Sequence, residues 1–172
     1  VGGGDPLLGT DGYVSSRKHP PKPATAIGAL AKAIKDEGVT HITGRVVVVD
    51  NRYDAERRVP SWSAGYTSNG DVGPLGALAV NDGFSSYAPL IAATDPAIAA
   101  GQALKDALSA IGVLVDGGVA RGNAVGTELA RVQSAPFAQV VTEMLTESDN
   151  NTAELLLKEL AYDAGTRPST RA

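Results

Sequence analysis

Ser148, Asp149 and Asn150 stand together between two apolar helical patterns near the C-terminal end of the sequence. A hydroxyl and a carboxamide two positions apart can work together in a cleft, where the hydroxyl relays a proton and the carboxamide holds a substrate amide. The same residue types are the preferred N-caps of helices, so a purely structural role is the alternative. A three-residue pattern with one free position is weakly specific, and both interpretations stay open at this point.

Three short elements build the site of one class of serine enzymes that form an acyl intermediate: Ser-x-x-Lys, Ser-x-Asn and Lys-Thr-Gly. Ser148 and Asn150 match the second element. A literal Ser-x-x-Lys occurs at Ser15 and Lys18, but the prolines that follow it prevent the helix that would hold the amine below the hydroxyl. We therefore interpret that stretch as a solvated loop. Lys-Thr-Gly does not occur, and the nearest string has Ile42 in place of the cation.

Other groups that could do chemistry are isolated in the sequence. His19 and His41 lie in different predicted elements without partners for a metal site or a Ser-His-Asp triad, so we expect both at the surface and no metal or cofactor. Trp62 and Tyr66 lie in a loop rich in Gly and Ser. They could stack on a ligand, but anchoring of the loop onto the core is the favoured interpretation. The opening "VGGGDP" lacks the lysine of a phosphate-binding loop.

The composition excludes several classes of function. The 172 residues include no cysteine, so neither a disulfide framework nor a thiol nucleophile is available. A net charge of -4 and a pI near 5.1 provide no basic face for nucleic acid, which we do not expect as a partner. No apolar run approaches the ~18 residues that a membrane helix requires. The chain opens without methionine or a signal-peptide pattern, and we expect it to be part of a longer protein.

Hydrophobic periodicity predicts the elements that position the triplet. Apolar residues recur at helical spacing from Ile27 to Ile34 and predict a helix over 24–37. Asp95 and Pro96 predict the start of another helix, which Gly112 ends. We further expect strands at 41–50, 77–80, 113–118 and 127–133, helices from Pro136 and after Asn150, and loops over 1–23 and most of 51–82. The triplet then lies in a short, rigid connector between two helices, as a catalytic pair requires.

The order and wording of several segments resemble one enzyme family. The strings "VGGGDPLL", "LAKAIKDEGVTHITGRVVVVD", "PSWSAGY", "ALAVNDG" and "RVQSAPFAQVVTEMLTESDNNTAELLLKELA" follow one another along the chain. Together they resemble the class C low-molecular-mass penicillin-binding proteins, the D-alanyl-D-alanine carboxypeptidases and endopeptidases of peptidoglycan remodelling. The resemblance runs from Val1 to about Gly165 and is strongest over Ser134 to Leu160.

The resemblance implies an α+β (α/β) fold, in which a β-lactamase/transpeptidase-like catalytic domain is split by a large inserted α/β module. Residues 1–130 would form that module, and residues 131–172 an incomplete return into the catalytic domain. The nucleophile, its lysine and the Lys-Thr-Gly strand are expected outside this chain, which by itself should be inactive. We also expect exposed apolar surface around Val140 to Leu157.

The resemblance further implies roles and partners. Ser148 would relay a proton toward the leaving amine, and Asn150 would contact the acyl side chain of the substrate. In some members, an acidic residue of the insertion binds the amino group of the stem-peptide diamino acid. Asp71 is the candidate for that residue here, and a turn-forming role is the alternative. The implied partners are peptidoglycan stem peptides and, as inhibitors, β-lactams. The implied location is exported, in the periplasm or cell-wall space, with peripheral membrane association possible.

Two other functions are alternatives to this one. A non-catalytic wall-binding or scaffolding domain would use Ser148 and Asn150 only as helix caps, and would bind muropeptides or a partner protein without being acylated. A class A β-lactamase is disfavoured, because its catalytic elements leave no room for so long an insertion.

Overall fold

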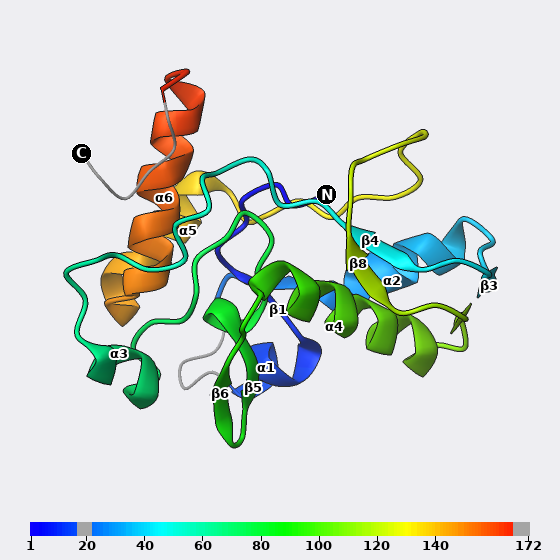
Figure 1. Cartoon of the computed structure of the whole chain (residues 1–172), viewed down its shortest axis with the longest axis horizontal. Helices are drawn as coiled ribbons and strands as arrows, with labels where there is room; N and C mark the ends of the chain where they lie inside the picture. Colours follow the sequence, from blue (N-terminus) through cyan, green and yellow to red (C-terminus); the bar gives the residue numbers. More distant parts are fainter. Residues whose placement is uncertain (17–21, 167–172) are drawn as a thin grey trace.

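The computed structural model describes residues 1–16 and 22–166 as a mixed α/β structure (Figure 1). The helices are α1 (Asp11–Ser16), α2 (Ile27–Asp36), α3 (Ala64–Asn69), α4 (Pro96–Ala110), α5 (Phe137–Glu147) and α6 (Asn150–Asp163), with a short 3-10 turn at Asn81–Gly83. The strands are β1 (Leu8–Gly9), β2 (Thr25–Ala26), β3 (His41–Ile42), β4 (Val46–Val48), β5 (Phe84–Tyr87), β6 (Leu90–Ala92), β7 (Leu114–Val115) and β8 (Val119–Arg121). This content is compatible with the expected α+β class.

The strands form four separate two-stranded ladders. β1 pairs with β2, β3 with β7 and β4 with β8, each in parallel, whereas β5 and β6 form an antiparallel hairpin. A parallel pair needs a crossover connection, and the chain between β4 and β8 includes α4, which packs on both strands. The expected strand over 41–50 is therefore confirmed in position but is divided into two short strands.

The longest helix, α4, starts and ends where the sequence predicts. Asp95 is its N-cap, and the carboxylate accepts the N–H groups of Ala97 at 3.0 Å and Ile98 at 3.2 Å, with Pro96 at the first helical position. At the other end Gly112 adopts a left-handed φ of 81°, which an L side chain would resist. α4 packs on α2 through two apolar clusters, which are built on Ile27, Val80 and Ala100, and on Ala31, Leu108 and Val113.

Three expectations about strands and loops are wrong. Residues 77–80 are not a strand, because their backbone groups bond outside any ladder. The Leu78 N–H donates to the Asp50 carboxylate at 3.1 Å, and the Ala77 carbonyl accepts the Gly4 N–H at 2.9 Å. Residues 127–133 form no strand and are mostly exposed. The opening is not all loop: β1 pairs with β2, and the Thr10 hydroxyl accepts the N–H of Tyr13 in the first turn of α1.

α5 and α6 lie at one end of the molecule, and α2 and β3 extend toward the other (Figure 1). A third apolar cluster, Tyr53, Leu75, Ala77 and Leu155, packs α6 against the segment that follows β4. The exposed side chains of Leu145 and Leu157 confirm the apolar surface expected around these helices. None of the described helices has the length and apolar character needed to span a bilayer.

Charged side chains also fasten α6 to the segment after β4. Glu159 accepts two hydrogen bonds from the Arg52 guanidinium, at 2.7 and 2.5 Å, and one from the Tyr53 hydroxyl at 2.8 Å. The guanidinium carbon lies 3.9 Å from the centre of the Tyr162 ring. The hydrogen bond from Arg52 holds the pKa of Glu159 below its usual range, and burial raises the pKa of Tyr53.

Glu159→Gln should destabilise the chain in a pH-dependent way. Because the folded-state pKa of Glu159 is lowered, its contribution is fully present above the ordinary value of 4.5 and is lost as pH falls through the folded pKa. We expect a loss of about 1 kcal/mol at pH 7 for this partly buried pair, and a smaller loss at about pH 3, below the ordinary pKa of the carboxyl. Urea unfolding at both pH values measures it. Glu128→Gln, in the exposed Glu128–Arg131 pair, is the matched control and should change little. An equal loss at both pH values would contradict the assignment.

Candidate active site

The candidate site begins at the junction of α5 and α6, where only two residues separate the helices. Ser148 ends α5 in the left-handed region, with φ 56° and ψ 43°, and Asp149 precedes the first residue of α6. The N–H of Asp149 still bonds back to the carbonyl of Met144 at 3.0 Å. The expected short connector is confirmed.

The structure separates the capping role from the other two residues of the triplet. Asp149 is the N-cap of α6, because its carboxylate accepts the N–H of Thr152 at 2.9 Å. The side chains of Ser148 and Asn150 make no hydrogen bond with any other described residue, and both residues are exposed. A structural role as side-chain caps therefore belongs to Asp149 and not to its two neighbours.

Asp149→Ala should lower the free energy of unfolding by about 1 kcal/mol, because the first turn of α6 loses its cap. Chemical denaturation of this chain measures the change. Asp71→Ala is the matched control, since Asp71 is exposed and caps no helix. Equal stability of the two variants would show that the Asp149 carboxylate does not cap α6 in solution.

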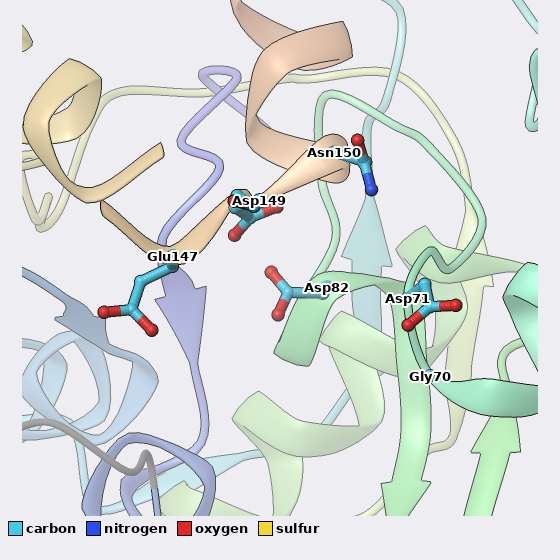
Figure 2. A pocket seen from close by; sticks show the side chains of 7 residues that line it. Gly70, Asp71, Asp82, Glu147, Asp149 and Asn150 are labelled. Atoms are coloured by element: carbon cyan, nitrogen blue, oxygen red, sulfur yellow. The ribbon is translucent and has the colours of Figure 1, made fainter. Parts of the chain in front are cut away.

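Ser148 and Asn150 line a pocket of about 240 Å³, together with Gly70, Asp71, Asp82, Glu147 and Asp149. Figure 2 shows Asn150 at the start of α6, and Asp82 in view between the helix junction and Asp71. The pocket therefore joins the helix junction to a wall formed by two segments that lie 65 or more residues earlier in the chain. All three candidate residues named from the sequence, Ser148, Asn150 and Asp71, line the same pocket.

Asp71 reaches the pocket from the loop that follows α3. Ser63 caps α3, accepting the N–H of Gly65 at 3.3 Å, and the N–H of Asp71 bonds to the carbonyl of Tyr66 at 2.8 Å. Trp62 packs against the apolar cluster that holds α6, as expected for an anchor. The same expectation fails for Tyr66, whose side chain is 46% exposed.

Asp82 lines the same wall and was not predicted. It lies in the turn that leads into β5 with φ 53°, directly after Asn81 with φ 55°. Its carboxylate accepts a hydrogen bond from the hydroxyl of Tyr13, whose ring lies edge-on to Tyr87 at 5.3 Å. The Asn-Asp-Gly string is a turn signal in the sequence, but nothing local indicates that the turn faces residues 148–150.

Acidic groups dominate the pocket. Asp71, Asp82, Glu147 and Asp149 line it, and Glu147 forms an ion pair with Lys22. Such a concentration of carboxylates favours a positively charged ligand group over a negative one. Across residues 1–16 and 22–166, no three histidine or carboxylate side chains converge in a way that would hold a metal ion.

Two motifs considered from the sequence lie away from the pocket. Ser15 is in α1 and not in a loop, and its hydroxyl donates to the carbonyl of Gly12 at 3.0 Å. Lys18 and His19 lie outside the described residues. His41 is exposed, as expected, and its Nε2 lies 2.8 Å from the carboxylate of Asp116.

Comparison with known proteins identifies the family. The model of the D-Ala-D-Ala carboxypeptidase 3 (S13) family matches residues 1–88 and 84–172. The chain is 32% identical to carboxypeptidase DacB of Mycolicibacterium smegmatis over 182 aligned residues, which cover 98% of this chain and 36% of that protein. It is 31% identical to carboxypeptidase Rv3627c of Mycobacterium tuberculosis over 168 aligned residues, covering 94% of this chain and 34% of that protein.

The chain belongs to the D-Ala-D-Ala carboxypeptidase 3 (S13) family, which confirms the resemblance seen in the sequence. It spans about a third of the length of the curated relatives that it matches.

Proposed function

We propose that this chain is part of a serine D-alanyl-D-alanine carboxypeptidase or endopeptidase that cleaves peptidoglycan stem peptides through an acyl-enzyme. One observation carries the proposal: Ser148 and Asn150 line one pocket while Asp149 alone caps the helix, so their side chains are left for a ligand. Family membership and the names of the two carboxypeptidase relatives support the reaction class.

In this proposal each residue acts on a different part of the bound peptide. The Ser148 hydroxyl relays a proton from the nucleophile toward the leaving amine, as general acid–base catalysis requires. The Asn150 carboxamide can both donate to and accept from the amide of the acyl part. Asp71 faces the pocket from the opposite wall, where its carboxylate would pair with the amino group of the diamino acid.

The proposal also covers the organisation of the longer protein. Residues 131–172 would join a β-lactamase/transpeptidase-like domain. Residues 1–130 would be an inserted module that contributes Asp71 and Asp82 to the site. The nucleophilic serine and its lysine would come from parts of the relatives that this chain does not span. The enzyme would act on cell-wall peptides outside the cytoplasm and would be inhibited by β-lactams.

Labelling with penicillin tests the proposal. The longer protein and this chain would each be incubated with a labelled penicillin, and their intact masses compared. Acylation of the longer protein alone is the expected result, because the proposal places the nucleophile outside this chain. Label on neither protein would overturn the acyl-enzyme mechanism and favour a wall-binding domain, and label on this chain would place a nucleophile at Ser15 or Ser148.

A further inference from the structure

Asn151, the residue after the Ser-x-Asn element, has a different environment from its neighbour. Asn150 is exposed and lines the pocket, whereas Asn151 is 2% exposed. Its Oδ1 accepts the N–H of Gly73 at 3.1 Å, and its Nδ2 donates to the carbonyl oxygen of Asp82 at 2.6 Å. One partner is a donor and the other an acceptor, so only one orientation of the carboxamide satisfies both.

The two partners belong to the two segments that form the far wall of the pocket. Gly73 follows Asp71 by two residues, and Asp82 itself lines the wall. The segments also touch each other: a Cβ on Gly73 would lie 2.0 Å from the carbonyl oxygen of Asp82. The Asn151 carboxamide, on the first turn of α6, therefore binds both segments where their backbones are in contact.

The turn at Asp82 needs such an anchor. Asn81 and Asp82 both adopt positive φ, 55° and 53°, a conformation that costs an L residue roughly 1 kcal/mol or more and persists when surrounding contacts fix it. Asn81 is fixed by its side-chain oxygen, which accepts the N–H of Thr10 at 2.8 Å. The carbonyl of Asp82 is fixed by Asn151, and its carboxylate by Tyr13.

We infer that Asn151 is a positioning residue, whose carboxamide sets the Asp71 and Asp82 wall opposite Ser148 and Asn150. Asn151 does not line the pocket, and it acts through the backbone of the two wall segments. The structural part of this inference stands on the contacts of Asn151 alone. Its consequence for catalysis rests on the proposed function.

Amide hydrogen exchange in this chain tests the structural part. The N–H of Gly73 is buried and bonds to Asn151, so Asn151→Leu should speed its exchange at least tenfold more than that of the Leu108 N–H inside α4. Asn123→Leu, the same change at an exposed position away from the pocket, should leave both rates unchanged. Equal acceleration of the two amides, or no acceleration, would overturn the inference.

A second variant keeps the test decisive if Asn151→Leu does not fold. Asn151→Asp retains an acceptor for the Gly73 N–H but loses the donor to the Asp82 carbonyl. It should keep the slow exchange of Gly73 while it releases the Asp82 turn, seen as a change in the amide chemical shifts of residues 81–83. Fast exchange at Gly73, or an unchanged turn, would contradict the assignment of the two bonds.

Kinetics of the longer protein test the catalytic part. Asn151→Leu should raise the KM for a stem peptide that carries a free amine about tenfold, whereas acylation by a small penicillin that carries no amine for the Asp71 and Asp82 wall should stay within about twofold. A variant that was merely destabilised would lose activity toward the stem peptide and acylation by penicillin to the same extent. That result would overturn the positioning role. If the wild-type protein takes no penicillin label, the proposed function fails while the exchange result still decides the structural inference.

Discussion

Ser148→Ala is expected to slow acylation of the longer protein by penicillin about 100- to 10,000-fold, the range that a positioned proton-transfer group supplies. The expectation follows from the placement of the hydroxyl: Ser148 lines the pocket, and its side chain bonds to no described residue. Stopped-flow or mass-based acylation rates measure the effect. Ser109→Ala, an exposed serine on α4 outside the pocket, is the matched control and should acylate at the wild-type rate.

The same substitution should leave the stability of this chain within about 0.5 kcal/mol of wild type, because no cap or buried bond is lost. Ser148→Gly sharpens the distinction. Ser148 has φ 56°, a region where glycine is not strained, so the glycine variant should be at least as stable as wild type but equally slow in acylation. Loss of stability without loss of acylation in either variant would reduce Ser148 to a structural residue.

The features that could be predicted from the sequence are those set by neighbouring residues. The ends of α4 were predicted because Asp95, Pro96 and Gly112 act within one turn of the helix. The strand expected over 77–80 has the right hydrophobic pattern, and Ala77 and Val80 are indeed buried. Its backbone bonds go to Gly4 and to the side chain of Asp50, which no local pattern reveals.

The same division applies to the candidate site. Ser148 and Asn150 were found because they are two residues apart, and Asp71 was supplied by the resemblance. Asp82 and Asn151 were missed, because their importance lies in contacts across 69 residues of chain. In the triplet, all three residue types are good helix caps, and only the hydrogen bond from the Thr152 N–H to the Asp149 carboxylate assigns that role to Asp149.

The outer helices depart from the usual apolar-inside pattern. Glu143 on α5 and Lys158 on α6 are buried at 2% and 1% exposure, while Leu145 and Leu160 are 69% and 59% exposed. The exposure of Leu145 belongs to the apolar surface expected around these helices. The inward face of α6 therefore combines the apolar contact of Leu155 with charged contacts, and the Lys158–Asp54 pair is the most buried ion pair among the described residues.

Lys158→Met should lower the free energy of unfolding by about 3 to 5 kcal/mol, the largest stability effect that we expect in this chain. The Lys158 Nζ lies 2.5 Å from Asp54 Oδ1, and the two side chains are 1% and 7% exposed. Methionine fills a similar volume, so the loss comes mainly from leaving the Asp54 carboxylate buried without its cation. Urea unfolding at neutral pH measures it.

Two comparisons distinguish the stability effect of breaking the buried Lys158–Asp54 pair from a general effect of removing a lysine. Lys32→Met removes one partner of the Lys32–Asp36 pair, whose side chains are 71% and 59% exposed, and should cost little because exposed pairs contribute less than about 1 kcal/mol. Lys158→Met combined with Asp54→Asn should recover part of the loss, because the stranded charge is removed as well. If the double variant is destabilised by the sum of the two single changes, Lys158 and Asp54 are not coupled, and α6 is held by its apolar contacts and by the Arg52–Glu159 pair.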